Sequence, residues 1–271
     1  MGNDNIVAHT KEDPQKLANL IEAMTFFTWI GKLKLGRSQR FTQFSDCLVV
    51  SCLKTEKSAV FNLLNAVLLS NIETVKRGYL LRGAVTSGKL YHTDDLVVGP
   101  AMVRAYEMES ELAEFPRVIV DRHVIKTGIE HHASHHGPED ELKYILSMLA
   151  IVLEKEVELE AHEESEAQGW WYLDYISLER VQNATGFSEN VYLDYLRTVS
   201  GLLKVGLKHQ SPKVVCKYEW LLEQYRRAIE RALEPSETEY LKFQSFYDGL
   251  RKLPRFTKHV PADQADKKRD I

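Results

Sequence analysis

Apolar positions along the chain alternate between helical spacing and short β-prone runs. The first helical pattern runs from Pro14 to about Lys32. Residues 40–52 follow as two short extended segments, and the second, 47–52, is almost continuously apolar, which predicts a buried strand. Ser45 and Asp46 lie between the two segments, where a hairpin would turn. We therefore predict a helix followed by a β-hairpin.

The pattern continues with alternating helices and strands up to residue 121. The predicted elements are a helix at 58–76, a strand at 79–88 that extends into a hairpin limb near residues 90–91, a turn at Asp94 and Asp95, a helix that begins at Gly99 and Pro100, and a strand at 116–121. Mixed strands and helices in this order predict an α/β fold, in which helices pack on a mixed sheet as an α+β sandwich.

The remainder of the chain is mostly helical in pattern. Helical spacing recurs over residues 139–155, 188–206, 213–233 and 236–250, and one β-like segment lies at 170–176. The end of the chain is charged and is expected to be disordered. We therefore expect an α/β domain at residues 1–125, a helical extension at 126–255 and a charged tail at 256–271.

The net charge and the cysteine content indicate which partners and which cellular compartment to expect. The formal net charge of −4 over 271 residues argues against a nucleic-acid partner. Three cysteines without CxxC spacing read as free thiols in a reducing compartment. No signal peptide and no stretch of about 20 apolar residues is evident, so we expect a cytoplasmic protein without a membrane partner.

Three residues are candidates for chemistry. Asp46, at a hairpin tip, could hold Mg²⁺ or Mn²⁺ against a triphosphate, or could simply cap the turn. Arg82 precedes Gly83 in an apolar strand and could bind phosphate, or could pair with a carboxylate at a sheet edge. Arg104 follows a helix N-terminus that could attract an anion, although Pro100 removes one donor there; otherwise it is a solvated helix residue.

Other motifs point away from common enzyme classes. The cluster from His131 to His136 contains two i, i+4 histidine pairs, a spacing that can bind zinc on a helix. Gly137 and Pro138 follow at once, which favours a solvated loop instead. The chain contains no GxxxxGK[ST], GxGxxG, GxSxG or HExxH motif, which argues against the P-loop, kinase, serine hydrolase and zinc protease classes.

Taken together, three segments resemble the catalytic domain of class III nucleotide cyclases. Residues 44–49 (FSDCLV) resemble its metal-binding hairpin, residues 81–88 (LRGAVTSG) the following strand, and residues 98–109 (VGPAMVRAYEME) the helix that lines the nucleotide. The resemblance covers about residues 10–121. It implies that Asp46 is one of two metal-binding aspartates and that Arg82 contacts the triphosphate. The Asn and Arg of the family's nucleotide-lining helix are not matched in register here, and Arg104 is the candidate substitute for that arginine.

The closer resemblance is to the pyrimidine cyclases of the bacterial Pycsar antiphage systems. It depends on the RGA and GPA motifs, on the strand at 116–121 and on residues 217–221 (KYEWL) in the helical extension. It implies a homodimer that uses Mn²⁺ or Mg²⁺ at a two-metal site and converts UTP or CTP to the 3′,5′-cyclic nucleotide and pyrophosphate. The product would activate a separate effector that halts phage growth.

The chain departs from the family pattern at the first metal-binding aspartate. That residue belongs to an Asp-x-x-Gly-Phe motif about 40 residues before the second aspartate, and here Asp4 is the only nearby carboxylate and lacks an apolar strand. The first strand of the domain is expected to be missing or truncated, because of a late start assignment, a trimmed chain or a degenerate cyclase. The alternatives are an inactive cyclase-like protein that binds a nucleotide or a partner, and an unrelated α/β scaffold whose helical half mediates assembly.

Overall fold

The computed structural model describes residues 15, 17, 18, 21–26, 36–44, 47–151 and 170–256. The chain forms two units. The first comprises Met1–Tyr175 with Glu179–Gly186, and the second comprises Ile176–Leu178 with Phe187–Ile271. The first unit extends beyond residue 125, where the sequence suggested a boundary, because strands that follow this point complete its sheet.

The first unit contains all of the described strands. They are β1 (Arg40–Phe44), β2 (Cys47–Ser51), β3 (Gly83–Val85), β4 (Tyr91–His92), β5 (Val97–Val98), β6 (Val118–Val120), β7 (Leu149–Ile151) and β8 (Trp171–Leu173). Its helices are α3 (Ala59–Lys76), α4 (Pro100–Glu107), the π-helical turn η1 (Met108–Leu112), α5 (Arg122–Glu130), α6 (Pro138–Leu146) and α7 (Leu178–Thr185). Described residues between 15 and 26 are helical, within the predicted first helix.

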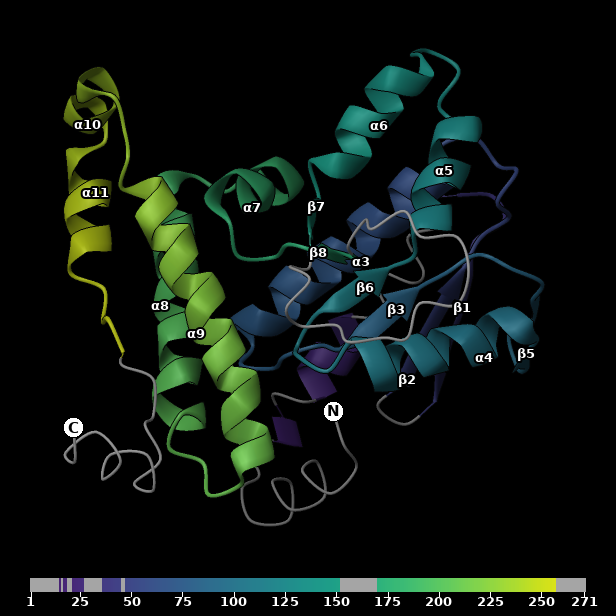
Figure 1. The fold of residues 1–271 in the computed structure, drawn as a ribbon, viewed down its shortest axis with the longest axis horizontal. Coiled ribbons are helices and arrows are strands. Elements are labelled where there is room, and N and C mark those ends of the chain that lie inside the picture. The colour runs from purple at the N-terminus through teal and green to yellow at the C-terminus, as the bar shows by residue number, and fades with distance from the viewer. Residues whose placement is uncertain are drawn as a thin grey trace, which may run out of the picture. The chain divides into compact units, whose positions relative to one another are not determined.

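A mixed four-stranded sheet forms the centre of this unit, in the order β3-β6-β8-β7 (Figure 1). β3 and β6 are parallel, whereas β8 is antiparallel to both β6 and β7. Each residue of β6 is buried, as its continuous Val-Ile-Val sequence predicts. The mixed α/β class expected from the sequence is therefore confirmed.

Two further sheets each contain only two strands. β1 and β2 form the predicted hairpin, in register from Phe44 and Cys47 at the turn to Arg40 and Ser51 at the other end. β4 and β5 form a second antiparallel pair around the predicted Asp94–Asp95 turn. Among the described strands, neither pair joins the central sheet.

Helices cover the sheet through close side-chain packing. α3 packs against α5 and α6, and α4 with η1 packs on β3. Gly128 of α5 permits this close approach, because a Cβ there would lie 2.5 Å from Ile145 of α6 and 3.1 Å from Val60 of α3. α5 was not predicted from the sequence, although Asp121 caps it by accepting a hydrogen bond from the His123 amide at 2.9 Å.

Two predicted elements differ from the structure. The expected strand at 79–88 is limited to Gly83–Val85, because only these residues pair with β6. The expected helix at 139–155 ends at Leu146 and is followed by β7, so the helical prediction is wrong for Leu149–Ile151. A short apolar run of this kind is compatible with a helix or a strand, and residues 149–151 form a strand because they pair with β8.

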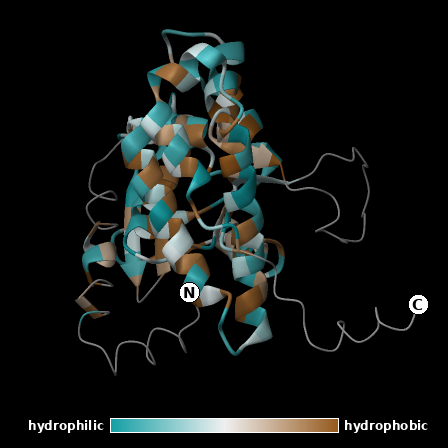
Figure 2. Ribbon diagram, turned by 90° about the vertical axis from the view of Figure 1, so that its left-hand side faces the viewer, coloured by the Kyte–Doolittle hydropathy of each residue, from teal (hydrophilic) through white to brown (hydrophobic). Residues whose placement is uncertain are grey.

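The second unit consists of helices, as its spacing predicted. They are α8 (Glu189–Gly206), α9 (Pro212–Ala232), α10 (Glu237–Lys242) and α11 (Gln244–Arg251). Hydrophobic and hydrophilic positions interleave along the helices (Figure 2). Buried Tyr192 donates a hydrogen bond to the Ile176 carbonyl at 2.7 Å, which ties α8 to the start of this unit.

Candidate functional site

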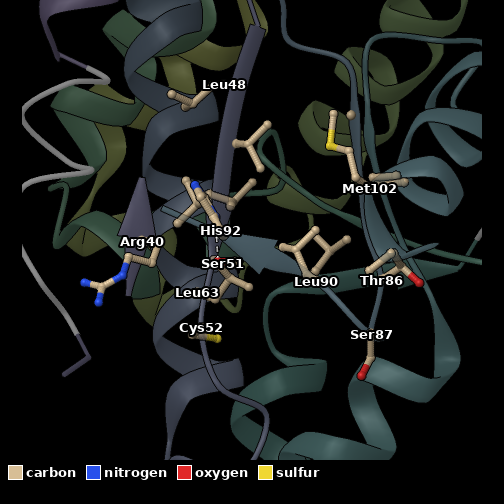
Figure 3. Close-up of a pocket in the computed structure, with 18 of the residues that line it drawn as sticks. Arg40, Leu48, Ser51, Cys52, Leu63, Thr86, Ser87, Leu90, His92 and Met102 are labelled. Carbon is tan, nitrogen blue, oxygen red and sulfur yellow. Dashed lines mark hydrogen bonds between the residues drawn. The ribbon is translucent and has the colours of Figure 1, made fainter. Parts of the chain in front are cut away.

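A large cavity lies within the first unit, beside the β1–β2 hairpin. Its volume is about 1350 Å³, and it is bordered by the segments 47–54, 81–90 and 101–110 together with one face of α3. In Figure 3, Ser51 and Cys52 lie near the centre of the view, whereas Thr86, Ser87 and Met102 lie to their right. Parts of all three segments that resemble the cyclase domain (44–49, 81–88 and 98–109) therefore border one cavity.

Asp46 itself lies outside the described residues, as does Ser45. The flanking residues Phe44 and Cys47 are paired across the two strands, so the expected antiparallel hairpin is confirmed. Cys47 and the rest of β2 border the cavity. The role of Asp46 as a metal ligand remains a prediction.

Arg82 lines the cavity and forms an ion pair with Glu109 of η1 through its Nε atom. Both side chains are partly exposed, at 31% and 26%. This is the carboxylate pairing that the sequence left open as the alternative to phosphate binding. The pair holds a guanidinium at the cavity wall, where a phosphate could compete with Glu109 for its donors.

Gly99 sets the position of α4 beside the cavity. Its φ of 147° lies in the region that favours glycine, and a Cβ there would lie 2.6 Å from the Lys89 carbonyl oxygen. The Ala101 amide donates to that same carbonyl at 3.1 Å. The glycine therefore allows the loop after β3 to pack directly against the start of α4.

Arg104 does not border the cavity. It is exposed on α4, and its guanidinium carbon lies 6.0 Å from the centre of the Trp170 ring. The same helix turns Ala101, Met102 and Ala105 toward the cavity. The structure thus places the three predicted site residues differently: Arg82 borders the cavity, Arg104 lies elsewhere, and Asp46 is outside the described residues.

The cavity lining carries an excess of positive charge that the sequence analysis did not identify. Arg82 and Glu109 offset one another, and the other basic residues of the lining are Arg37, Arg40, Lys54 and Lys89. Glu109 is the only acidic residue among the described residues of the lining. Net positive charge in a concave site favours anionic ligands. Because these residues are far apart in sequence, no local pattern marks them as a group.

His92 links the two small sheets at the cavity through a network that sequence reasoning also missed. His92 Nε2 lies 3.0 Å from the Thr42 hydroxyl oxygen, and His92 Nδ1 lies 2.7 Å from the Ser51 hydroxyl oxygen. Neutral His92 therefore donates a hydrogen bond to one of these hydroxyls and accepts one from the other. Burial, with a smaller effect of Arg40, lowers the pKa of His92 below its ordinary value, and the nearby Asp94 opposes this.

Cys52, next to Ser51, is an unreactive thiol in this environment. Burial, together with the charge of Glu56, raises its pKa to about 11. In the described part of the chain, Cys47, Cys52 and Cys216 form no disulfide bonds, as expected from their spacing.

The described residues do not assemble a metal site. No group of three or more His, Cys, Asp or Glu side chains among them could hold an ion. In the histidine cluster, His136 Nε2 lies 2.5 Å from Glu141 Oε2, and Glu141 is only 1% exposed. The expected loop is confirmed, but His136 is packed against a buried carboxylate rather than solvated.

Comparison of the chain with models of protein families, with curated proteins and with solved structures found no match. Within the part of the chain that the structure describes, no helix has the length and apolar character needed to cross a bilayer.

Proposed function

We propose that this protein is a pyrimidine nucleotide cyclase that converts UTP or CTP to the 3′,5′-cyclic nucleotide and pyrophosphate. The observation that carries the proposal is the meeting of three separate segments, 47–54, 81–90 and 101–110, at one cavity of about 1350 Å³. They overlap the segments 44–49, 81–88 and 98–109, in which the sequence resembles class III cyclases. The basic lining supports an anionic substrate such as a triphosphate.

Arg82 is the residue with the clearest proposed role. In the reaction the ribose 3′-oxygen attacks the α-phosphorus, pyrophosphate leaves, and the 3′-hydroxyl proton passes to solvent. A guanidinium at the cavity wall would offset the negative charge that develops on pyrophosphate. Because Glu109 occupies Arg82 in this structure, substrate binding would require this ion pair to open.

In this proposal, Asp46 is the only residue of the chain that is assigned to bind the metal ion. Mg²⁺ or Mn²⁺ would lower the pKa of the 3′-hydroxyl and steady the triphosphate. The described residues alone do not fit such an ion, since they provide no cluster of ligands. We therefore derive no step through the metal from the geometry of the cavity.

A homodimer is proposed together with the cyclase activity. Apolar side chains are exposed on the β4–β5 pair and on α4: Tyr91, Leu96, Val98, Val103 and Tyr106. Tyr91 and Val98 are direct cross-strand partners, and Val103 and Tyr106 are one helical turn apart, so each pair shares a face. Exposed apolar patches of this kind support association. A cytoplasmic location and a separate effector that responds to the product complete the proposal.

The cyclase proposal is tested by incubating the protein with each of the four nucleoside triphosphates and Mn²⁺. Cyclic products are separated by liquid chromatography and identified by mass spectrometry. We expect cyclic UMP or cyclic CMP, with at least about a 100-fold loss of rate in Arg82→Ala. Arg104→Ala serves as the matched control and should retain activity, because Arg104 does not border the cavity. No product from UTP or CTP, using protein with a verified full-length N-terminus, would overturn the proposal.

The second candidate function is an inactive cyclase-like protein that binds a nucleotide or a partner. The Arg82–Glu109 ion pair favours it, because this pair occupies the proposed phosphate ligand. Calorimetric titration with UTP and CTP separates the two functions. Saturable binding without cyclic product would support the inactive protein, whereas turnover would exclude it.

A further inference from the structure

The second unit has a strongly basic end where α8 connects to α9. Between Asp194 and Glu219 the sequence contains no acidic residue, although the whole chain carries a formal net charge of −4. The basic residues of this interval, apart from one histidine, are Arg197, Lys204, Lys208, Lys213 and Lys217. The four lysines occupy the last turn of α8, the connection that follows it and the first two turns of α9. Residues 204–217 are called the basic tip.

The two sides of the basic tip are held together by close packing. Gly206 lies directly against Tyr218, since a Cβ at Gly206 would be 2.2 Å from the Tyr218 ring. The connection is itself hydrogen-bonded: the Ser211 amide donates to His209 Nδ1 at 3.0 Å, and the His209 amide donates to the Gly206 carbonyl at 3.2 Å. The connection lies at the lower end of both helices in Figure 1. The lysines of α8 and α9 are therefore presented together at one end of the helical hairpin.

Three lysines of the basic tip lack a carboxylate partner. Lys204, Lys208 and Lys213 are exposed, and no ion pair among the described residues includes any of them. Arg197, by contrast, pairs with Asp194 at 2.6 Å. Like charges four positions apart repel one another, so this grouping is not explained by the stability of the hairpin. A concentration of uncompensated positive charge is typical of a surface that meets an anionic partner.

An exposed apolar side chain lies among these lysines. Val205 is 75% exposed, more than any other large hydrophobic side chain in the described part of the chain. It directly follows Lys204, and its carbonyl accepts a hydrogen bond from the Lys208 amide at 3.2 Å, so the three residues share one exposed turn. A valine between lysines suits a lipid surface, because its methyl groups can enter the boundary of the acyl chains while the ammonium groups stay at the headgroups.

The chemistry of the basic tip favours a bilayer over a nucleic acid. Its permanent positive charges are all lysines, whereas the planar fork of arginine is the group that matches nucleic-acid phosphates and bases. Residues 204–217 contain no Phe, Tyr or Trp on which a base would stack. The sequence-based expectation of no membrane partner considered only segments that span a bilayer, and binding to the surface of a bilayer requires no such segment.

We propose that the basic tip docks on an anionic lipid bilayer, with its three unpaired lysines at the headgroups and Val205 at the boundary of the acyl chains. Each lysine near such a surface strengthens binding about fivefold, so the three lysines together contribute about a hundredfold. Binding of this strength is reversible and is weakened by salt. The inference is independent of the cyclase activity, because the tip belongs to the second unit and the cavity lies within the first.

The test measures sedimentation of the full-length protein with sucrose-loaded vesicles, without nucleotide or metal. Vesicles of phosphatidylcholine with about 30% phosphatidylglycerol are compared with vesicles of phosphatidylcholine alone. The anionic vesicles should bind the protein about a hundredfold more strongly at low salt. Raising the salt from about 0.1 M to about 1 M shortens the Debye length from about 10 Å to about 3 Å and should remove most of this difference.

Two variants with the same loss of charge locate the binding at the tip. The tip variant carries Lys204→Gln, Lys208→Gln and Lys213→Gln. The control variant carries Lys126→Gln, Lys143→Gln and Lys242→Gln. The tip variant should lose about a hundredfold in binding to the anionic vesicles, and the control variant should lose less than about fivefold. All six positions are exposed, so thermal unfolding followed by circular dichroism should be nearly unchanged in both variants.

Val205→Thr separates a lipid surface from other polyanions. Threonine keeps the branched shape but adds a hydroxyl group, so binding to the anionic vesicles should fall several-fold. A fluorescein-labelled DNA duplex, measured by fluorescence anisotropy, is the comparison. Its binding to the wild type should be weaker than binding of the anionic vesicles, and Val205→Thr should leave it unchanged.

Three outcomes would overturn the proposal. The first is equal binding to anionic and neutral vesicles, and the second is an equal loss of binding in the tip variant and the control variant. The third is duplex binding as tight as vesicle binding, with no effect of Val205→Thr on either, which would assign the basic tip to nucleic acid instead. The absence of nucleoside triphosphate from every arm keeps these results separate from the result of the cyclase assay.

Discussion

Arg82 and Glu109, which are 27 positions apart in the sequence, form an ion pair at the wall of the cavity. Their side chains are 31% and 26% exposed, so the pair is partly screened and contributes at most about 1 kcal/mol to the free energy of unfolding. The pair is thus weak enough to open when a phosphate competes for the guanidinium. A substitution of Glu109 therefore tests directly whether Arg82 binds phosphate.

Glu109→Gln should release Arg82 without removing it. If Arg82 binds phosphate, the Michaelis constant for UTP or CTP should fall several-fold, because the substrate no longer competes with a carboxylate. Urea denaturation should detect a change of no more than about 1 kcal/mol. The opposite change, a higher Michaelis constant with unchanged stability, would mean that Glu109 positions Arg82 for binding rather than blocking it.

Gly99→Ala should destabilise the fold by about 1–3 kcal/mol, because the residue has a φ of 147° and its new Cβ would meet the Lys89 carbonyl oxygen at 2.6 Å. Urea denaturation measures the loss. Gly201→Ala is the matched control: it lies on an exposed position of α8 with no other atom within 4 Å of a Cβ, so it should stabilise the protein by about 0.5–1 kcal/mol. Equal effects at the two sites would contradict the role of Gly99.

His136→Ala should lower the free energy of unfolding by about 1–3 kcal/mol, because it removes the hydrogen-bond partner that lies 2.5 Å from a carboxyl oxygen of Glu141, a side chain that is only 1% exposed. The same Glu141 oxygen also accepts a hydrogen bond from the Ala133 amide at 3.4 Å. His135→Ala changes a neighbouring exposed residue and should alter stability by less than about 0.5 kcal/mol. Thermal and urea denaturation of both variants provide the comparison.

Local sequence patterns predicted the positions of several elements around the cavity. The apolar run at 47–52, the helical spacing of 58–76 and the Gly99-Pro100 helix start each depend on neighbours within a few positions. The prediction that the first of these is a buried strand was wrong, because every residue of β2 is exposed or half-buried. β7 was assigned to a helix because its three residues are too few to show a period. Its structure is decided by β8, which begins about 20 residues later in the chain.

The side chains that meet at the cavity were harder to predict from the sequence than the helices and strands that carry them. Asp46, Arg82 and Arg104 were selected by residue type and order, but the direction of Arg104 depends on how α4 packs. The Arg82–Glu109 pair and the Ser51–His92 hydrogen bond span 27 and 41 positions. Contacts of this length follow from tertiary packing, so no local pattern reveals them.

His92 provides the pH-dependent prediction for the cavity. Its pKa is lowered in the folded protein by burial and by Arg40, against Asp94, so the folded state favours neutral His92. The unfolded chain takes up the proton below about pH 6.5. The unfolded state therefore binds more protons in this range, and the contribution of His92 to stability is complete above about pH 6.5 and decreases as the pH falls below it.

His92→Gln removes this titration while a polar side chain remains near Thr42 and Ser51. Urea denaturation of both proteins should be measured between about pH 7.5 and pH 5. The stability advantage of the wild type over the variant should be largest near neutral pH and should shrink on acidification, since protonated His92 can no longer accept a hydrogen bond from either the Thr42 or the Ser51 hydroxyl. An advantage that stays constant over this range would show that His92 keeps the same charge in the folded and unfolded protein.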